Sequence, residues 1–146
     1  MLKIYHNFKI HAPAEKVFGA ISTINGLKNW WTTETSGNPE PGGEIRFGFG
    51  KDLYNLMKVT AGERNKSVGW EIVKSTFPEC KLWLGSKISF VLSEGEDKNT
   101  VVKFQHFNWS DTYEFCGVCN YQWAMAMESL KLLCETGKGN PKQFKP

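Results

Sequence analysis

The chain has 146 residues, 40% of them hydrophobic and 23% charged, a composition that indicates one folded domain with its own core and excludes a disordered chain. The net charge of +3 is small and the lysines are scattered, which argues against binding to nucleic acid or to a membrane surface. We find no signal peptide and no apolar run near 18 residues, so we expect a soluble, cytoplasmic protein. Its four cysteines are then expected to be reduced thiols.

The first part of the chain combines one strand with two short helices. Residues 2–11 alternate between apolar and polar, which predicts a half-buried strand. Pro13 suits the first turn of a helix, and the apolar spacing after it predicts short helices over residues 14–22 and around residues 24–29. Residues 32–43 are rich in Thr, Pro and Gly, and we expect them to form a loop.

From residue 44 onward the apolar residues recur with a period of two, which is the period of a strand. The predicted strands cover residues 44–49, 54–61, 68–72, 88–92 and 101–108. The connections are short turns, apart from a less regular one at 75–80 that contains a proline. Strands joined by short turns are antiparallel, so these segments predict one antiparallel sheet.

The C-terminal part is dominated by one predicted helix of about 26 residues, Asp111 to Thr136, ~39 Å long at about 1.5 Å per residue. Asp111 with Glu114 resembles a capping box, and Gly137 is a natural stop. The apolar arc of this helix is wide and extends over a second flank. The two sets are Phe115, Cys119, Trp123, Met127, Leu130 and Leu133, and then Val118, Tyr121, Met125 and Leu132. We expect a curved antiparallel sheet to wrap this helix in an α+β fold.

Four segments then match one known pattern in the right order. They are Ala12-Pro13-Ala14-Glu15-Lys16-Val17-Phe18, Trp30-Trp31-Thr32, Gly42-Gly43-Glu44-Ile45-Arg46-Phe47, and the helix end from Ser129 to Gly139. Together they resemble the START-like (SRPBCC, birch-pollen-allergen-like) superfamily, and within it the domain homologous to the activator of the heat-shock-protein-90 ATPase. The resemblance implies a single helix-grip domain over residues 1–146, with two short helices after the first strand closing one end.

The resemblance also implies two kinds of function. Many relatives hold a cavity between sheet and helix, and some bind lipids, hormones or polyketides there. The chaperone co-factor members contact a partner protein instead. The chain departs from the pattern at Met125, where many relatives carry His, and at Gln122, where many carry Gly. These departures remove a polar group that could work at the helix–sheet interface, and they argue against catalysis.

Aromatic residues make up 14% of the chain, and the prediction of a ligand-binding site is based on them. Ligand cavities have apolar walls with a few polar groups, while a filled core is the other explanation of the same residues. The residues predicted to line a cavity are Trp30, Trp31, Phe47, Phe49, Trp70, Phe104, His106, Trp123 and Met127. Trp83 and Phe115 belong to the same aromatic set. His106 would supply the polar contact to a ligand, or else be a hydrogen-bonded histidine at the edge of the core.

Cys116 and Cys119 form a C-x-x-C motif about one turn inside the predicted helix. A redox site would place the first cysteine at a helix N-terminus, and a zinc site needs two further ligands at suitable spacing. Neither condition is met in the sequence. We therefore predict no metal site, no cofactor and no catalytic residue, and we assign the two thiols to packing.

The resulting hypothesis is a binding module that holds a small apolar or aromatic ligand between sheet and helix without chemistry. Two alternatives remain. One is a chaperone-associated interaction domain that stimulates a partner ATPase, and the other is a cyclase- or hydrolase-type enzyme on a small hydrophobic substrate. We expect a monomer or a homodimer, with no nucleic-acid or membrane partner.

Overall fold

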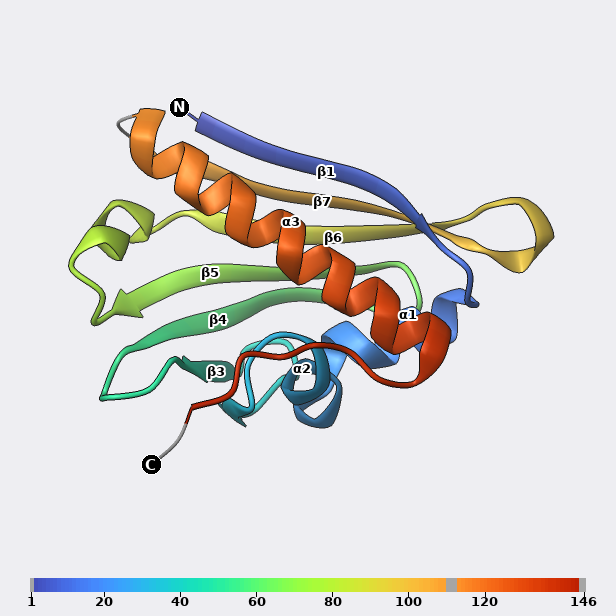
Figure 1. Cartoon of the computed structure of the whole chain (residues 1–146), viewed down its shortest axis with the longest axis horizontal. Coiled ribbons are helices and arrows are strands. Elements are labelled where there is room, and N and C mark those ends of the chain that lie inside the picture. The colour runs from blue at the N-terminus through green and yellow to red at the C-terminus, as the bar shows by residue number, and fades with distance from the viewer. Residues whose placement is uncertain (1, 110–112, 145–146) are drawn as a thin grey trace.

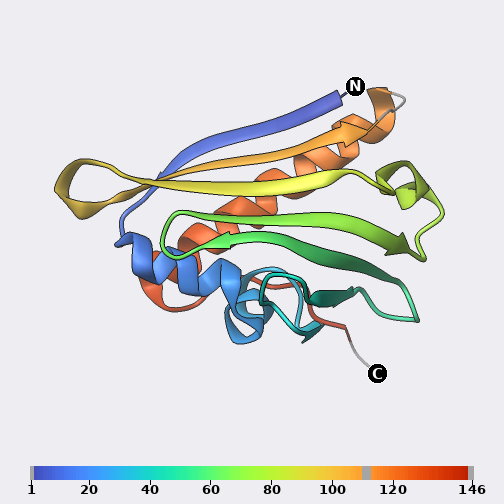
Figure 2. The same cartoon turned by 180° about the vertical axis from the view of Figure 1, so that it is seen from behind.

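The protein consists of two layers, an antiparallel sheet and a long helix, α3, that lies across one face of it (Figure 1; Figure 2). The computed structural model describes residues 2–109 and 113–144. Within these residues seven strands form one sheet in the order β1-β7-β6-β5-β4-β3-β2. The strands are β1 (Leu2–Ile10), β2 (Glu34–Gly37), β3 (Glu44–Gly48), β4 (Tyr54–Glu63), β5 (Ser67–Ser75), β6 (Lys87–Glu94) and β7 (Thr100–Trp109). The predicted helix-grip architecture is confirmed.

Two short helices close one end of the sheet, as predicted (Figure 2). They are α1 (Ala14–Ser22) and α2 (Ile24–Trp30), and the 3-10 turns η1 (Glu79–Trp83) and η2 (Glu96–Lys98) lie between later strands. The Thr23 hydroxyl accepts a hydrogen bond from the Gly26 amide at 2.9 Å and caps the start of α2. The Trp30 indole N–H donates to the Ala20 carbonyl at 2.8 Å, which fixes α2 against α1.

Strand β2 is a feature that the sequence prediction placed wrongly in a loop. It pairs with β3 at the edge of the sheet, with Thr35 opposite Phe47. The Thr35 side chain is buried, and its hydroxyl donates to the Thr32 carbonyl at 2.6 Å. A strand of four residues that ends in Gly37 is too short to develop an apolar period, so only its pairing partner reveals it.

Helix α3 covers Tyr113–Thr136, close to the predicted range. The expected cap at Asp111 lies outside the described residues. The stop at Gly137 is confirmed, because this glycine adopts a left-handed φ of 85° and its amide donates to the Leu133 carbonyl at 2.9 Å.

Only one side of α3 is covered by the sheet. Its buried stripe contains Cys119, Trp123, Met127, Leu130 and Cys134, each at most 4% exposed. The second apolar flank is not buried, and the expectation that the whole arc is wrapped is wrong. Val118, Tyr121, Met125 and Leu132 are between 44% and 65% exposed. The physical reason is that a two-layer fold gives a helix a single neighbouring layer.

The sheet-facing side of α3 is held by a chain of hydrogen bonds that starts at Trp123. The Trp123 indole N–H donates to His106 Nδ1 at 3.2 Å, so the neutral imidazole carries its proton on Nε2. That nitrogen is 2.8 Å from Ser86 Oγ, and the Ser86 hydroxyl donates to the Trp83 carbonyl. The chain therefore links α3 to β7 and then to the end of η1, through a histidine with no exposed surface.

No helix among the described residues is long and apolar enough to cross a membrane.

The neutral, buried His106 predicts a pH-dependent stability. Burial lowers the pKa of His106 to about 3 from its ordinary 6.5. Between these two values the unfolded chain binds a proton that the folded chain does not. The free energy of unfolding should therefore fall as the pH falls below 6.5, by about 1.4 kcal/mol per pH unit, and stay level above it. Guanidinium unfolding curves between about pH 7.5 and about pH 5 measure this slope.

The control for this prediction is the variant His106→Gln, which has no titrating group at this position. Burial also lowers the pKa of His6, so a part of the slope in the same direction will remain in the variant. The variant should lose most of the slope, whatever its stability at neutral pH. An identical slope in the two proteins would contradict the assignment.

Candidate ligand-binding site

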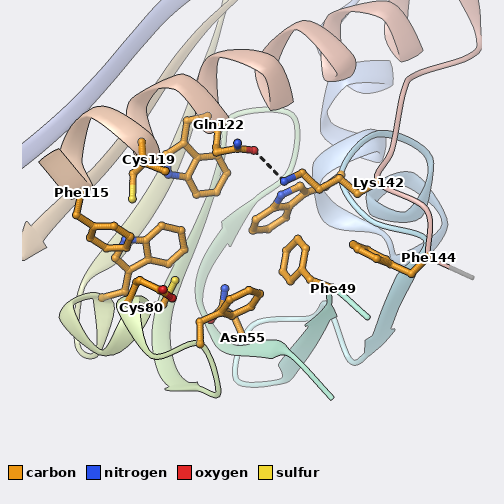
Figure 3. A pocket seen from close by; sticks show the side chains of 14 residues that line it. Phe49, Asn55, Cys80, Phe115, Cys119, Gln122, Lys142 and Phe144 are labelled. Atoms are coloured by element: carbon orange, nitrogen blue, oxygen red, sulfur yellow. Dashed lines mark hydrogen bonds between the residues drawn. The ribbon is translucent and has the colours of Figure 1, made fainter. Parts of the chain in front are cut away.

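A cavity of about 600 Å³ lies beside the first half of α3 (Figure 3). The helix crosses the sheet obliquely and begins near β1 and β7 (Figure 1). The pocket is lined by Asn55, near the start of β4, and by Phe77, just after the end of β5. Volumes of about 300–1,000 Å³ are typical of small-molecule sites. The lining residues are Trp31, Phe49, Asn55, Phe77, Glu79, Cys80, Trp83, Phe115, Val118, Cys119, Gln122, Trp123, Lys142 and Phe144.

The aromatic walls of this pocket are fixed by contacts between their rings. The ring centroid of Trp123 lies 5.0 Å from that of Trp31 and 6.1 Å from that of Trp83, with which it is nearly parallel at 12°. Phe49 contacts Phe77 at 5.4 Å between ring centroids. Interlocked rings of this kind have few alternative rotamers, so the pocket offers flat, preformed apolar walls.

Two buried polar atoms belong to side chains of the pocket wall and have no hydrogen-bond partner: Asn55 Oδ1 and Trp83 Nε1. The two side chains are only 3% and 8% exposed. Buried polar groups are nearly always paired, and leaving one unpaired costs about 1–3 kcal/mol. Figure 3 shows the Asn55 amide nitrogen directed into the cavity. Each of the two is a buried polar group of the pocket wall that the described side chains leave unpaired.

Lys142 brings a cation to the other side of the pocket, together with Phe144 (Figure 3). Its backbone is clamped, because its amide donates to the Trp31 carbonyl at 2.8 Å and its carbonyl accepts from the Thr33 amide at 3.0 Å. Its ammonium donates to Gln122 Oε1 at 2.8 Å. Burial lowers the pKa of Lys142. Among the described residues no carboxylate lies within salt-bridge distance of its ammonium.

The Cys80 thiol of the pocket is poorly suited to nucleophilic chemistry. Burial raises the pKa of the Cys80 thiol to about 11, so it stays protonated at neutral pH. Cys119 also lines the pocket, one helical turn after Cys116. Within the part of the chain that the structure describes, no three His, Cys, Asp or Glu side chains gather closely enough to hold a metal ion.

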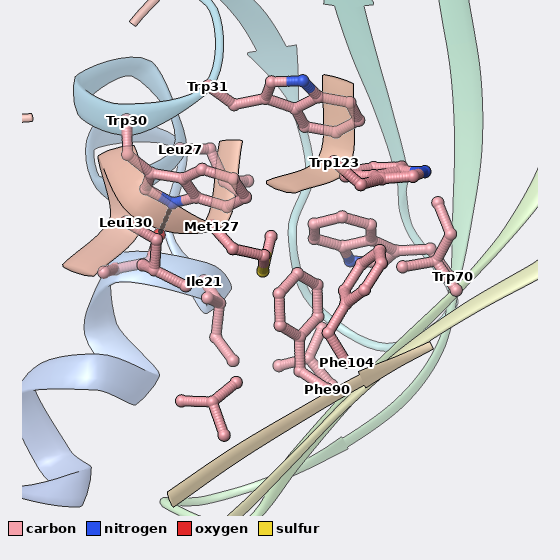
Figure 4. Close-up of a cluster of buried hydrophobic side chains, with 14 of the residues drawn as sticks. Ile21, Leu27, Trp30, Trp31, Trp70, Phe90, Phe104, Trp123, Met127 and Leu130 are labelled. Atoms are coloured by element: carbon pink, nitrogen blue, oxygen red, sulfur yellow. Dashed lines mark hydrogen bonds between the residues drawn. The ribbon is translucent and has the colours of Figure 1, made fainter. Parts of the chain in front are cut away.

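The structure brings three of the nine predicted lining residues to the pocket: Trp31, Phe49 and Trp123. Trp83 and Phe115, from the same aromatic set, also line it. The other six are buried in the core, and Figure 4 shows Trp30, Trp70, Phe104 and Met127 among them. They are Trp30, Phe47, Trp70, Phe104, His106 and Met127, and none is more than 3% exposed. Their side chains pack against one another, as where Phe47 meets Trp70 at 5.4 Å between ring centroids.

His106 lies behind the pocket wall, where both of its ring nitrogens have protein partners. Its ring contacts Trp83 edge-on at 4.6 Å between centroids. His106 therefore positions the indoles of Trp83 and Trp123 and does not reach the cavity. This agrees with the second of the two roles expected from the sequence, the hydrogen-bonded core histidine.

The two departures from the family pattern have different outcomes. Met125 is 44% exposed on the outer side of α3, so the expectation that this position faces the helix–sheet interface is wrong for this chain. Gln122 lines the pocket and supplies a polar group there.

Sequence reasoning missed several pocket residues. Asn55 looked like an ordinary position in a strand, and Phe77 sits in the irregular connection. Lys142 and Phe144 follow the last helix, where no periodicity applies. Only the return of the C-terminal segment to Thr32, with which Lys142 forms a parallel bridge, brings these two residues to the site.

Comparison with known proteins agrees with the fold and the sequence pattern. Residues 11–135 match the family described as "Activator of Hsp90 ATPase homolog 1-like protein". The solution structure of the Aha1 dimer from Colwellia psychrerythraea is 38% identical, with a TM-score of 0.82 over 95% of this chain and 100% of that one. Comparison with curated protein sequences gave no match.

Two more distant structures share the fold. The protein MLL2253 from Mesorhizobium loti is 18% identical, with a TM-score of 0.79 over 90% of this chain and 96% of that one. The protein BH1534 from Bacillus halodurans is 21% identical, with a TM-score of 0.71 over 92% of this chain and 98% of that one. The family match spans most of the sequence, and the chain belongs to the Activator of Hsp90 ATPase homolog 1-like family, within the START-like superfamily.

Proposed function

We propose that this protein binds a small, largely apolar molecule in the pocket beside the first half of α3. The observation that carries the proposal is a cavity of about 600 Å³ with rigid aromatic walls beside a core that is otherwise filled. An apolar surface left open to water is unfavourable by about 25 cal/mol per Å². A ligand that covers the half-buried rings of Phe49, Phe77 and Phe115 removes part of that cost.

The side chains of the pocket favour binding of a ligand without a chemical reaction. The protonated Cys80 thiol is a weak nucleophile, and His106 has a pKa of about 3 and no access to the cavity. The remaining polar groups of the pocket, Asn55, Gln122 and Lys142, are suited to orienting a ligand.

A neutral fluorescent probe tests the pocket directly. N-phenyl-1-naphthylamine should bind to the native protein with one site and a rise in fluorescence. Phe49→Ala should weaken this binding roughly tenfold, because the lost contact of a buried phenyl ring amounts to about 1.5–3 kcal/mol at most. Val73→Ala, on a side chain that is 41% exposed and outside the pocket, is the matched control. Absence of binding to the native protein would contradict the proposal.

A second candidate function is self-association through the outer side of α3. Tyr121, Met125 and Leu132 recur at intervals of four and seven and form one exposed apolar stripe along the helix, which the exposed Val118 continues toward the pocket that it also lines. Stripes with this spacing are typical of helix–helix contacts. The 38% identical protein from Colwellia psychrerythraea is described as a dimer, which favours a second copy of this chain as the occupant.

Size-exclusion chromatography with light scattering, which gives the molar mass of the protein in solution, tests whether the stripe forms a dimer. We expect the mass of a dimer for the native chain and that of a monomer for Tyr121→Lys, because a charge buried at an apolar contact is strongly unfavourable. Tyr5→Lys, at an exposed tyrosine on β1, should keep the dimer. A monomeric native chain would contradict self-association. The family description would then direct the next assay to the ATPase rate of an Hsp90 chaperone.

A further inference from the structure

We infer that the ligand of this pocket is an acid, a flat apolar molecule with one carboxylate or similar anionic group that meets the ammonium of Lys142. This inference rests on the proposed binding function and adds the chemical class of the ligand. It depends on three observations, the state of the Lys142 cation, the balance of hydrogen-bond donors and acceptors in the pocket, and the shape of the apolar walls.

Lys142 is an exposed residue at the rim of the pocket, and among the described residues its ammonium has no carboxylate within salt-bridge distance. The ammonium has three N–H donors, and its described side-chain partner is the neutral amide oxygen of Gln122 at 2.8 Å. The ring of Phe49 adds a weak contact, with the ammonium 5.8 Å from the ring centroid. The carboxylate of Glu79 belongs to the same pocket but lies beyond salt-bridge distance. A cation in this position is stabilised by an anion that arrives with the ligand.

The position of this cation is built into the fold. The backbone of Lys142 is held on both sides, to the Trp31 carbonyl and to the Thr33 amide. Gln122, the residue before the buried Trp123 on α3, holds the ammonium end toward the helix. A charge fixed before binding loses little conformational entropy on binding, which is the condition for an effective anchor.

Several hydrogen-bond donors border the pocket, beside two acceptors, the carboxylate of Glu79 and Asn55 Oδ1. Lys142 is a donor, and the Asn55 amide nitrogen is directed into the cavity (Figure 3). Trp83 Nε1 is a donor by chemistry and has no partner. Because Gln122 Oε1 is already occupied by Lys142, its amide nitrogen is the part that is left for a ligand. A pocket with these groups is complementary to a molecule rich in acceptor oxygens.

The walls select the shape of the rest of the molecule. The ring planes of Trp83 and Trp123 are nearly parallel, at 12°, and the ring of Trp31 contacts that of Trp123. Flat indole faces make their largest contact with flat rings. A planar aromatic acid thus fits better than a flexible fatty acid, although both share the anionic group, and the experiment below separates them.

The test compares two probes of almost equal shape, 2-naphthoate and its neutral counterpart 2-naphthamide, by titration calorimetry at neutral pH. In the native protein the naphthoate should bind roughly tenfold more tightly, because a charge-assisted hydrogen bond is stronger than a neutral one. In Lys142→Met the preference should vanish or reverse, since a carboxylate is costly to bury without a cation. Lys138→Met removes an exposed lysine outside the pocket and should keep the native preference.

Each outcome has one meaning. Equal binding of the two probes to the native protein, or an unchanged preference in Lys142→Met, overturns the inference about the acid and leaves the proposed binding function intact. Failure of both naphthalene probes together with N-phenyl-1-naphthylamine overturns the binding function itself.

Decanoate, a flexible acid, should bind more weakly than naphthoate, and tighter binding would overturn the planar part of the inference. Melting curves of the variants exclude unfolding, and Lys142→Gln serves if Lys142→Met is not folded.

Discussion

The burial of one stripe of α3 against the sheet is the contact on which the rest of this structure depends. Within a protein, the stability of a helix comes mainly from the apolar face that it buries. Trp123 lies in the middle of that stripe and contacts Trp31, Trp83 and Phe104 through its ring. Its indole N–H requires an acceptor inside the protein, and His106 provides one only in its neutral form. One residue thus joins the core, the pocket wall and the ionisation state of a buried histidine.

The pocket follows from the same contact. Helix α3 crosses the sheet obliquely, from the ends of β1 and β7 toward α1 (Figure 1). On the side of α1 and α2 the space between the layers is filled by large side chains such as Trp30 and Phe90 (Figure 4). Beside the first half of α3 the chain places η1 and the C-terminal segment as walls instead of filling the space (Figure 3). The filled core and the open pocket are therefore two parts of one helix–sheet interface.

The two sides of α3 have different chemistry and support different kinds of contact. Its inner side carries Cys119 and Trp123 into the pocket, where Asn55, Trp83 and Lys142 add polar groups. Its outer side presents Tyr121, Met125 and Leu132 to the surroundings. A fold of this type constrains function only weakly, since the same framework can hold a ligand inside and meet a protein outside. The named side chains are what separates these functions.

The sequence by itself determined the layer architecture, because apolar periods of two and of 3.6 report which residues of a strand or helix face the core. It also identified the aromatic residues from which both core and pocket are built. It could not determine which aromatics fill space and which border it: Trp30 and Trp31 are neighbours in the chain, yet one is core and the other pocket wall. Nor could it place Lys142, which reaches the pocket through a parallel bridge to Thr32 about 110 residues earlier. Only the tertiary structure decided these points, because a cavity is the volume that packing leaves over, and that volume depends on all elements at once.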